Sequence, residues 1–248
     1  MIRSVQFQNA AGHTLRGMLT LPEGREKAAC YVNLHGFSGT MGGFRSAHVH
    51  LARQLLAQDV ACLRFDFFGN GESDGEFEEM TFTTLLQDTA AACAWVRSQP
   101  WFSGTLILSG QSLGGLVAAN AAPAVQPQAL VLMCPGAPMW FGCKERSDAL
   151  REKGVEYGDI GGLKFSHDFN YDLARYNPFE DAKGYRGPVL LVRGAKDELV
   201  DEATIQRYIQ GYTSPEYAVV EGGDHNFASI PARAACETAI CGFVTRQV

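Results

Sequence analysis

A serine between two glycines is the first candidate for chemistry in this sequence. The stretch TLILSGQSLGGLVAA (105–119) contains Gly110, Ser112 and Gly114, which match the G-x-S-x-G pattern of a nucleophilic serine. The pattern has this meaning only when a strand precedes it and a helix follows it, because the serine must stand on a sharp turn. An apolar run ends at Ser109 and the helix-forming residues LVAANAA follow. The sequence around Ser112 therefore fits this context.

Two later positions could activate this serine. A serine hydroxyl is a weak nucleophile until a base takes its proton, and in this pattern the acid and then the base come later in the chain. Asp197 follows the apolar run VLLVRG, and His225 follows another apolar run and a Gly–Gly turn. Both stand at the tips of predicted strands, where catalytic groups of parallel sheets collect. His225 would take the proton from Ser112, and Asp197 would hold the imidazole in the correct tautomer.

Neighbouring residues compete for these two roles. Asp201 is better explained as the cap of the helix that follows it, and Asp224 is adjacent to His225, which gives poor geometry. Glu198 is the next alternative for the acid, and His167 is the weaker base because it lies in a segment that breaks the strand–helix alternation. A loop serine, a capping aspartate and a solvated histidine would each be ordinary alone. Three such residues at strand tips favour a catalytic set.

A reaction at an acyl carbon also needs two backbone N–H groups that bind the developing oxyanion. One is expected from Leu113, the residue after the serine. The other is expected from the loop that follows the predicted strand 28–34 and reads HGFSGTMGGF, where Phe37 is the natural donor. Gly36 allows this loop to turn tightly, and we expect a structural role for His35.

The elements that must position these residues can be predicted from hydrophobic patterns. The first two segments, SVQFQ and LRGMLTL, flank a turn-like stretch and predict an antiparallel hairpin. Continuous apolar runs then predict strands buried on both faces, and amphipathic stretches between them predict helices. The predicted strands are 28–34, 60–67, 105–110, 129–135, 188–194 and 216–222, and the predicted helices are 48–58, 81–99, 201–212 and 232–246. This alternation predicts an α/β fold with a mostly parallel sheet, helices on both faces and right-handed crossovers.

One segment, 136–187, breaks the alternation because it contains no convincing central strand. A structureless loop of this length would be unusual in a compact domain. We therefore expect one α/β core formed by residues 1–135 and 188–248, with 136–187 inserted as a small cap.

Charge and motif content exclude several other functions. The formal net charge is −6 and no cluster of Lys and Arg appears, which argues against nucleic-acid binding. The glycines of GNGESDG (69–75) are not in the register of a dinucleotide-binding loop, and there is no Walker pattern. His48 and His50 are two positions apart in a predicted helix, so they do not share a face. We expect no cofactor and no metal.

The cysteines favour a reducing compartment. The chain has seven cysteines, an odd number without a C-x-x-C spacing, and most lie in apolar runs where a reduced thiol acts as a small hydrophobe. The first residues lack the apolar region of a signal peptide, and no run of about 18 apolar residues predicts a membrane span. We expect a cytoplasmic protein that binds no membrane.

The motifs LHGFSG, RFDFFGNGESDG, GQSLGG, GAKDELV and EGGDHNF follow one another as in α/β-hydrolases, which the chain resembles over nearly its whole length. More narrowly, it resembles bacterial feruloyl (cinnamoyl) esterases through the HGF loop, the DF-to-SDG stretch, the GGDH motif and an insertion of similar size. The resemblance implies an α/β-hydrolase fold with a mostly parallel eight-stranded sheet. It implies Ser112, Asp197 and His225 as the triad, Phe37 and Leu113 as oxyanion donors, and a cap that contacts the phenolic ring of a hydroxycinnamoyl ester.

Aromatic and polar residues of the insertion are the candidates for contacts with that ring. They are Trp140, Tyr157, Phe169 and Tyr171 as walls, and Asp148 and Asp159 as partners of a phenol hydroxyl. Packing within the insertion is the alternative explanation for all of them. The chain departs from many of these esterases at Gln111, where they have His, and at Leu113, where they have Gln.

Together these features predict a serine carboxylic-ester hydrolase that cleaves small aryl or hydroxycinnamoyl esters through an acyl-enzyme. A short-chain alkyl or aryl carboxylesterase, or a thioesterase, is the alternative within this class. A non-catalytic ligand-binding protein on the same fold is the alternative from another class. The expected partner is a small-molecule ester, and the oligomeric state is left open, with a homodimer as one option.

Overall fold

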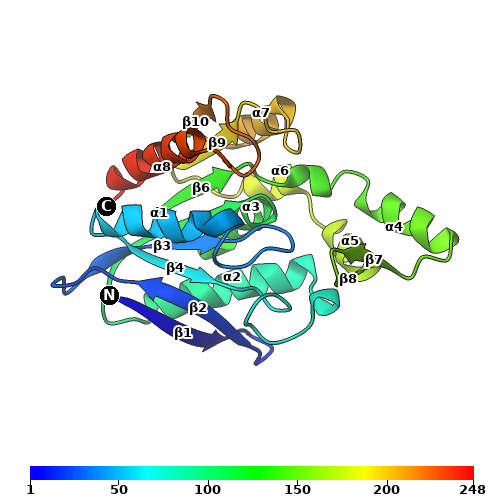
Figure 1. Ribbon diagram of the computed structural model, residues 1–248, viewed down its shortest axis with the longest axis horizontal. Helices are drawn as coiled ribbons and strands as arrows, with labels where there is room; N and C mark the ends of the chain where they lie inside the picture. The colour runs from blue at the N-terminus through cyan, green and yellow to red at the C-terminus, as the bar shows by residue number, and fades with distance from the viewer.

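Every strand predicted from the sequence is present and joins one central sheet (Figure 1). A computed structural model describes residues 1–248. The strands of the sheet are β1 (Ile2–Gln8), β2 (Thr14–Thr20), β3 (Ala28–Leu34), β4 (Ala61–Phe65), β5 (Phe102–Gln111), β6 (Ala129–Met133), β9 (Val189–Gly194) and β10 (Pro215–Val220). Their order across the sheet is β1-β2-β4-β3-β5-β6-β9-β10, and only the pairings β1–β2 and β2–β4 are antiparallel. The predicted mostly parallel, eight-stranded sheet is confirmed.

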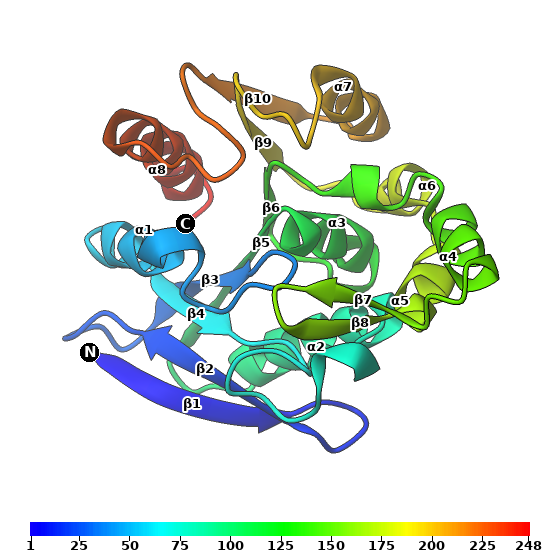
Figure 2. The ribbon, with the colours of Figure 1, turned by 45° about the vertical axis from the view of Figure 1, so that its right-hand side comes forward.

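Helices cover both faces of this sheet (Figure 2). The main ones are α1 (Ala47–Leu56), α2 (Phe82–Arg97), α3 (Leu113–Val125), α7 (Glu202–Gly211) and α8 (Ile230–Thr245). Helices α1 and α8 pack against each other on one face, while α2 and α3 pack together on the other. Strands β3, β4 and β6 are buried along their whole length, as expected for strands covered on both sides.

Most predicted bounds shift by one to three residues in the structure, and two differences have a clear physical reason. Strand β10 was expected to be buried on both faces, but it is the edge of the sheet and Val219 is exposed. Helix α8 begins at Ile230, earlier than predicted, because the Ser229 hydroxyl accepts the N–H of Ala232 and caps the helix. Pro231 is tolerated there because the first turn of a helix needs no backbone donor at that position.

The segment 136–187 adds no strand to the central sheet. It contains η3 (Ala137–Met139), α4 (Cys143–Glu152), β7 (Tyr157–Ile160), β8 (Leu163–Ser166), α5 (His167–Leu173) and α6 (Pro178–Ala182). Strands β7 and β8 pair only with each other, and α4 and α5 extend beside them at one end of the molecule (Figure 1). Helix α6 instead packs against α3 and α7 of the core. The predicted division into core and cap remains a prediction.

The seven cysteines are all buried and free. None of the helices combines the length and the apolarity that crossing a membrane would need.

Candidate active site

Ser112 stands on the turn between β5 and α3. Its φ of 55° is positive, which is a strained conformation for a residue that carries a Cβ atom. The neighbouring glycines make this turn possible, because a Cβ atom on Gly110 would lie only 2.1 Å from the carbonyl oxygen of Gly114. The strand–turn–helix setting predicted for Ser112 is therefore present, and the fold presents its half-buried side chain at the carboxyl end of the sheet.

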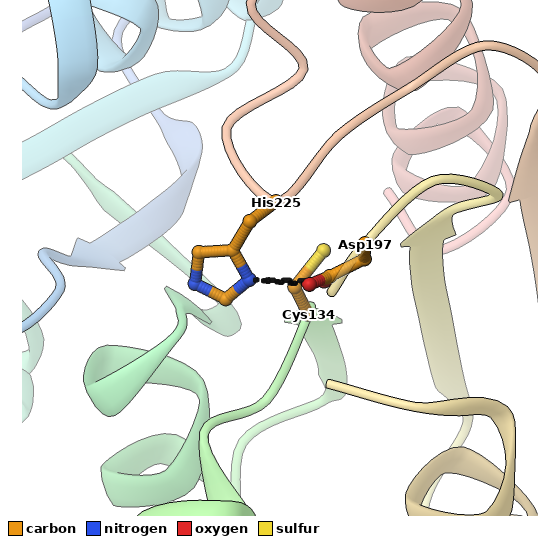
Figure 3. A group of neighbouring side chains, drawn as sticks. All are labelled: Cys134, Asp197 and His225. Atoms are coloured by element: carbon orange, nitrogen blue, oxygen red, sulfur yellow. Dashed lines mark hydrogen bonds and ion pairs between the residues drawn. The ribbon is translucent and has the colours of Figure 1, made fainter. Parts of the chain in front are cut away.

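Asp197 and His225 lie in the loops that follow the neighbouring strands β9 and β10. The Nδ1 atom of His225 lies 3.0 Å from Oδ1 and 2.9 Å from Oδ2 of Asp197. The Asp197 side chain is 0% exposed, and its Oδ1 also accepts the N–H groups of Leu199 and Val200 at 2.9 and 3.0 Å. The two loops thus hold a buried acid against one nitrogen of a nearly buried imidazole (Figure 3).

The surroundings of Asp197 keep its carboxyl ionised. Burial by itself raises the pKa of a carboxyl, but the hydrogen bond from His225, the neighbouring Cys134 thiol and the Val200 N–H outweigh burial and lower the pKa of Asp197 to about 2. An ionised carboxylate can only accept hydrogen bonds, so His225 carries a proton on Nδ1. The Nε2 atom of a neutral His225 is then unprotonated, which is the tautomer that a general base needs.

Ser112 and His225 line the same cavity, which has a volume of about 520 Å³. Gly36, Phe37 and Leu199 also line it. The Ser112 hydroxyl makes no hydrogen bond to His225 in the structure. Catalytic hydrogen bonds are often long until a substrate is bound, so this geometry is compatible with a nucleophile and its base.

The two expected oxyanion donors lie on either side of Ser112. The N–H of Phe37 has no hydrogen-bond partner, and Leu113 is the first residue of α3, where an N–H has no acceptor within the helix. A Cβ atom on Gly36 would lie 3.4 Å from the Cβ atom of Ser112, so the loop and the nucleophile approach closely. The arrangement offers free backbone donors beside the serine, although their role as an oxyanion hole stays a prediction.

His35 has the structural role expected from the sequence. Its Nδ1 donates to the carbonyl of Gly36 at 2.9 Å, and its Nε2 accepts the N–H of Phe67 at 3.2 Å. Burial lowers the pKa of His35, so the imidazole is neutral and its proton stays on Nδ1. His35 therefore fixes the start of the loop that carries Phe37.

Cys134 is a neighbour of the pair that the sequence did not reveal as part of a site. Its sulfur, a carboxylate oxygen of Asp197 and a ring nitrogen of His225 lie within 4.8 Å of one another (Figure 3). These are ligand types that a transition metal accepts. However, burial and the nearby Asp197 charge raise the pKa of the Cys134 thiol well above its usual value, and Asp197 and His225 bind each other. The protons in this cluster suit an acid–base pair better than a metal centre.

The six cap candidates do not line the cavity that contains Ser112. Phe169 is fully buried, with its ring centroid 6.2 Å from that of Phe37. The Tyr171 hydroxyl donates to the carboxylate of Asp148 at 2.9 Å, and Lys144 pairs with the same carboxylate at 2.7 Å. For these three candidates the structure gives packing and pairing contacts within the segment 136–187 and with Phe37.

The other three cap candidates are also engaged locally. Trp140 packs against the hydrophobic core and lies 5.7 Å from the ring of Phe141. Tyr157 is exposed, with the ammonium of Lys164 5.2 Å from its ring centroid. Asp159 accepts the N–H of Gly162 in the hairpin turn. Contacts of any of the six with a substrate therefore remain a prediction.

Aromatic side chains connect the cap to the loop that carries Phe37. The ring of Phe37 lies 5.4 Å from Phe77, which belongs to a short 3-10 helix η2 (Phe77–Glu79), and 5.0 Å from Phe165 of β8. Phe165 in turn lies 5.3 Å from Phe169 of α5. We call Phe37, Phe77, Phe165 and Phe169 the aromatic cluster. It fastens the cap hairpin directly to the residue expected to donate to the oxyanion.

Comparisons with known proteins agree with this fold. A model of the family described as serine aminopeptidase, S33, matches residues 25–143. Est1E from Butyrivibrio proteoclasticus, solved with ferulic acid bound, has a TM-score of 0.87 at 24% identity, over 98% of this chain and 98% of that one. Alpha/beta hydrolase domain-containing protein 10 from mouse has a TM-score of 0.76 at 18% identity, over 99% and 100% of the two chains.

Curated sequences give further relatives, which match only part of their own length. An uncharacterised protein of Mycobacterium tuberculosis is 29% identical over 186 residues, which are 74% of this chain and 59% of that protein. The mitochondrial palmitoyl-protein thioesterase ABHD10 of Mus musculus is 26% identical over 205 residues, 77% of this chain and 66% of that protein. The match thus spans less than two thirds of the length of the first of these relatives.

The order of the sheet, the turn at Ser112 and the solved structures show that the chain has the α/β-hydrolase fold. Among proteins of this fold it resembles Est1E over almost its whole length, which confirms the resemblance predicted from the sequence.

Proposed function

We propose that the chain is a serine esterase in which Ser112 is the nucleophile, His225 the general base and Asp197 the acid that orients it. The observation that carries this proposal is the buried, ionised Asp197 bound to Nδ1 of His225 in the loop beside Ser112. This arrangement leaves Nε2 of His225 free to accept the serine proton.

The reaction would run in two steps through a covalent acyl-enzyme. Ser112 Oγ attacks the ester carbonyl while Nε2 of His225 takes its proton, and the N–H groups of Phe37 and Leu113 stabilise the oxyanion. His225 then gives the proton to the leaving alcohol. A water molecule repeats the sequence on the acyl-enzyme, and the acid is released. Each oxyanion donor of this kind is worth about 3–4 kcal/mol in acyl-transfer enzymes.

For the substrate, we propose small aryl esters, with hydroxycinnamoyl esters as the leading class. Two observations support this choice: the similarity to Est1E, which was solved with ferulic acid, and the aromatic cluster that adjoins the Phe37 loop. Of this cluster Phe37 lines the cavity that contains Ser112, and a contact between its ring and an aryl acid would contribute affinity beyond area burial. The substrate would bind with its carbonyl between Ser112 and the free N–H of Phe37.

A thioesterase is the second candidate, because a palmitoyl-protein thioesterase is among the relatives of the chain. An assay with methyl ferulate, p-nitrophenyl butyrate and an acyl-CoA under the same conditions separates the candidates. We expect turnover of methyl ferulate to exceed that of the other two. Cleavage of the short alkyl ester or of the thioester, without cleavage of methyl ferulate, would exclude the hydroxycinnamoyl substrate.

Covalent labelling separates an enzyme from a ligand-binding protein on the same fold. A fluorophosphonate probe should modify Ser112 in the wild-type chain and leave the Ser112→Ala variant unmodified, because only an activated serine reacts with it. Peptide mapping by mass spectrometry identifies the modified residue. An unlabelled wild-type protein that is folded would rule out the esterase.

A further inference from the structure

Gln111, the last residue of β5, has a side chain that touches the loops on both sides of Ser112. It is 7% exposed. Its Nε2 donates to the backbone carbonyl of His225 at 3.1 Å and to Oδ1 of Asn226 at 3.3 Å. Its Oε1 lies 3.0 Å from Nε2 of His48 on α1. The amide of Gln111 is therefore bonded at both ends, and one end holds the residue that would be the base.

The chemistry of the partners fixes the orientation of this amide. A backbone carbonyl can only accept, so the NH₂ group of Gln111 must face His225 and its oxygen must face His48. His48 must then donate from Nε2, which requires a proton on that nitrogen. Burial lowers the pKa of His48 to about 4, so the ring is neutral at physiological pH. This tautomer leaves Nδ1 of His48 unprotonated, and that atom is buried without a hydrogen-bond partner.

His48 also belongs to the segment that carries the expected oxyanion donor. Its backbone N–H donates to the carbonyl of Gly42 at 3.1 Å, and its ring packs so closely on Gly43 that a Cβ atom there would lie 2.5 Å from the ring. The chain of contacts from the β3–α1 loop through His48 and Gln111 ends at the carbonyl of His225. One side chain therefore connects the donor loop, the nucleophile turn and the base loop.

We propose that Gln111 is a positioning residue that sets the His225 loop at the correct distance from Ser112. The proposal rests on the proposed esterase function. Asp197 binds Nδ1 of the imidazole, but no hydrogen bond joins the ring to Ser112 in the structure. Gln111 precedes Ser112 in the chain. Its hydrogen bond to the His225 carbonyl therefore ties the His225 loop to the turn that carries the nucleophile.

The test compares Gln111→Met, which removes all three side-chain hydrogen bonds, with Gln111→Glu, which keeps the shape but places an acceptor against the His225 carbonyl. A misplaced base reduces the chemical step, so we expect kcat on the best ester of the panel to fall about 10- to 100-fold in both variants. KM should change less than kcat, because the proposed role of Gln111 is to position His225, even though its side chain also lines the cavity that contains Ser112. The rate of fluorophosphonate labelling should fall in parallel with kcat.

A pH profile distinguishes positioning from a loss of folded structure. The buried carboxyl in the Gln111→Glu variant would have a raised pKa, and once protonated it could again donate to the His225 carbonyl. The kcat of this variant relative to the wild type should therefore rise as the pH falls, whereas the same ratio for Gln111→Met should stay flat. The matched controls are Gln54→Met and Gln54→Glu, at an exposed glutamine of α1, which should leave kcat and its pH profile unchanged.

The outcomes separate this proposal from the function on which it rests. A wild-type chain that neither hydrolyses an ester nor reacts with the probe refutes the esterase. An active wild type with both Gln111 variants within twofold of its kcat refutes positioning by Gln111 alone. If Gln111→Met also lowers the melting temperature, the pH profile of Gln111→Glu decides between positioning and a loss of folded structure. A ratio of its kcat to that of the wild type that does not change with pH refutes the proposal.

Discussion

The hydrogen bond between Asp197 and Nδ1 of His225 leaves Nε2 as the nitrogen that could serve Ser112, so substitutions of single side chains should be informative. Ser112→Ala removes the nucleophile, and we expect kcat to fall by about 10⁶-fold without loss of folding. Asp197→Asn keeps the shape of the acid but presents an amide to His225, which favours the wrong tautomer, and kcat should fall by about 10⁴-fold. Steady-state kinetics on the best ester measures both effects. Rates close to wild type in either variant would contradict the triad.

Local patterns were enough to select these three candidates, because each lies in the turn or loop that follows a strand. Ser112, Asp197 and His225 could be chosen from apolar runs and the turn residues behind them. The contact between His48 and Gln111 could not be predicted in this way. The two residues are 63 positions apart and meet only where the start of α1 lies beside the end of β5. Cys134 had a signal, since it follows the apolar run of β6, but a buried thiol is ordinary in such a run.

The β7–β8 hairpin and the Phe37 loop are joined through the aromatic cluster, and this contact should influence catalysis. Phe165→Ala leaves a void beside Phe37, so the backbone N–H of Phe37 should become less well fixed. We expect kcat to fall about 3- to 10-fold, since a donor that is only displaced loses part of the roughly 3 kcal/mol that it can contribute. Because Phe165 is partly buried, the substitution should also lower the free energy of unfolding by about 1–3 kcal/mol.

The control for this effect is another aromatic residue of the cap. Phe141 is partly exposed and lies near Trp140 and Phe179 rather than in the aromatic cluster. Phe141→Ala should lower the melting temperature slightly and leave kcat unchanged. Equal losses of kcat in Phe141→Ala and Phe165→Ala would mean that the cap acts through its general stability, not through Phe37.

Elements were predicted more reliably than the contacts between them. The strand β3 occupies the predicted range, because a continuous apolar run has few other interpretations in an α/β chain. The cap was expected as an insertion, but its hairpin could not be foreseen from a charged and glycine-rich stretch. The strand order that places β9 beside β6 depends on long-range packing, and sequence periodicity contains no information about it.

The folding stability of the whole chain should depend on the same carboxylate that orients His225. Asp197 has a folded pKa of about 2, against an ordinary value of 3.8, so the unfolded chain binds this proton first as the pH falls. The stabilisation is therefore complete above about pH 4 and is lost as the pH falls toward 2. The shift corresponds to about 2 kcal/mol in the free energy of unfolding. Urea unfolding at several pH values between 2 and 7 measures it.

Asp197→Asn should remove this part of the acid sensitivity, because the amide oxygen can still accept the N–H groups of Leu199 and Val200 but has no proton to gain. The free energy of unfolding of this variant should fall less than that of the wild type between pH 4 and 2. Asp168→Asn, at an exposed position of α5, is the control and should follow the wild-type curve. If Asp197→Asn and the wild type lose the same stability over this range, the Asp197–His225 pair does not hold a strongly ionised carboxylate.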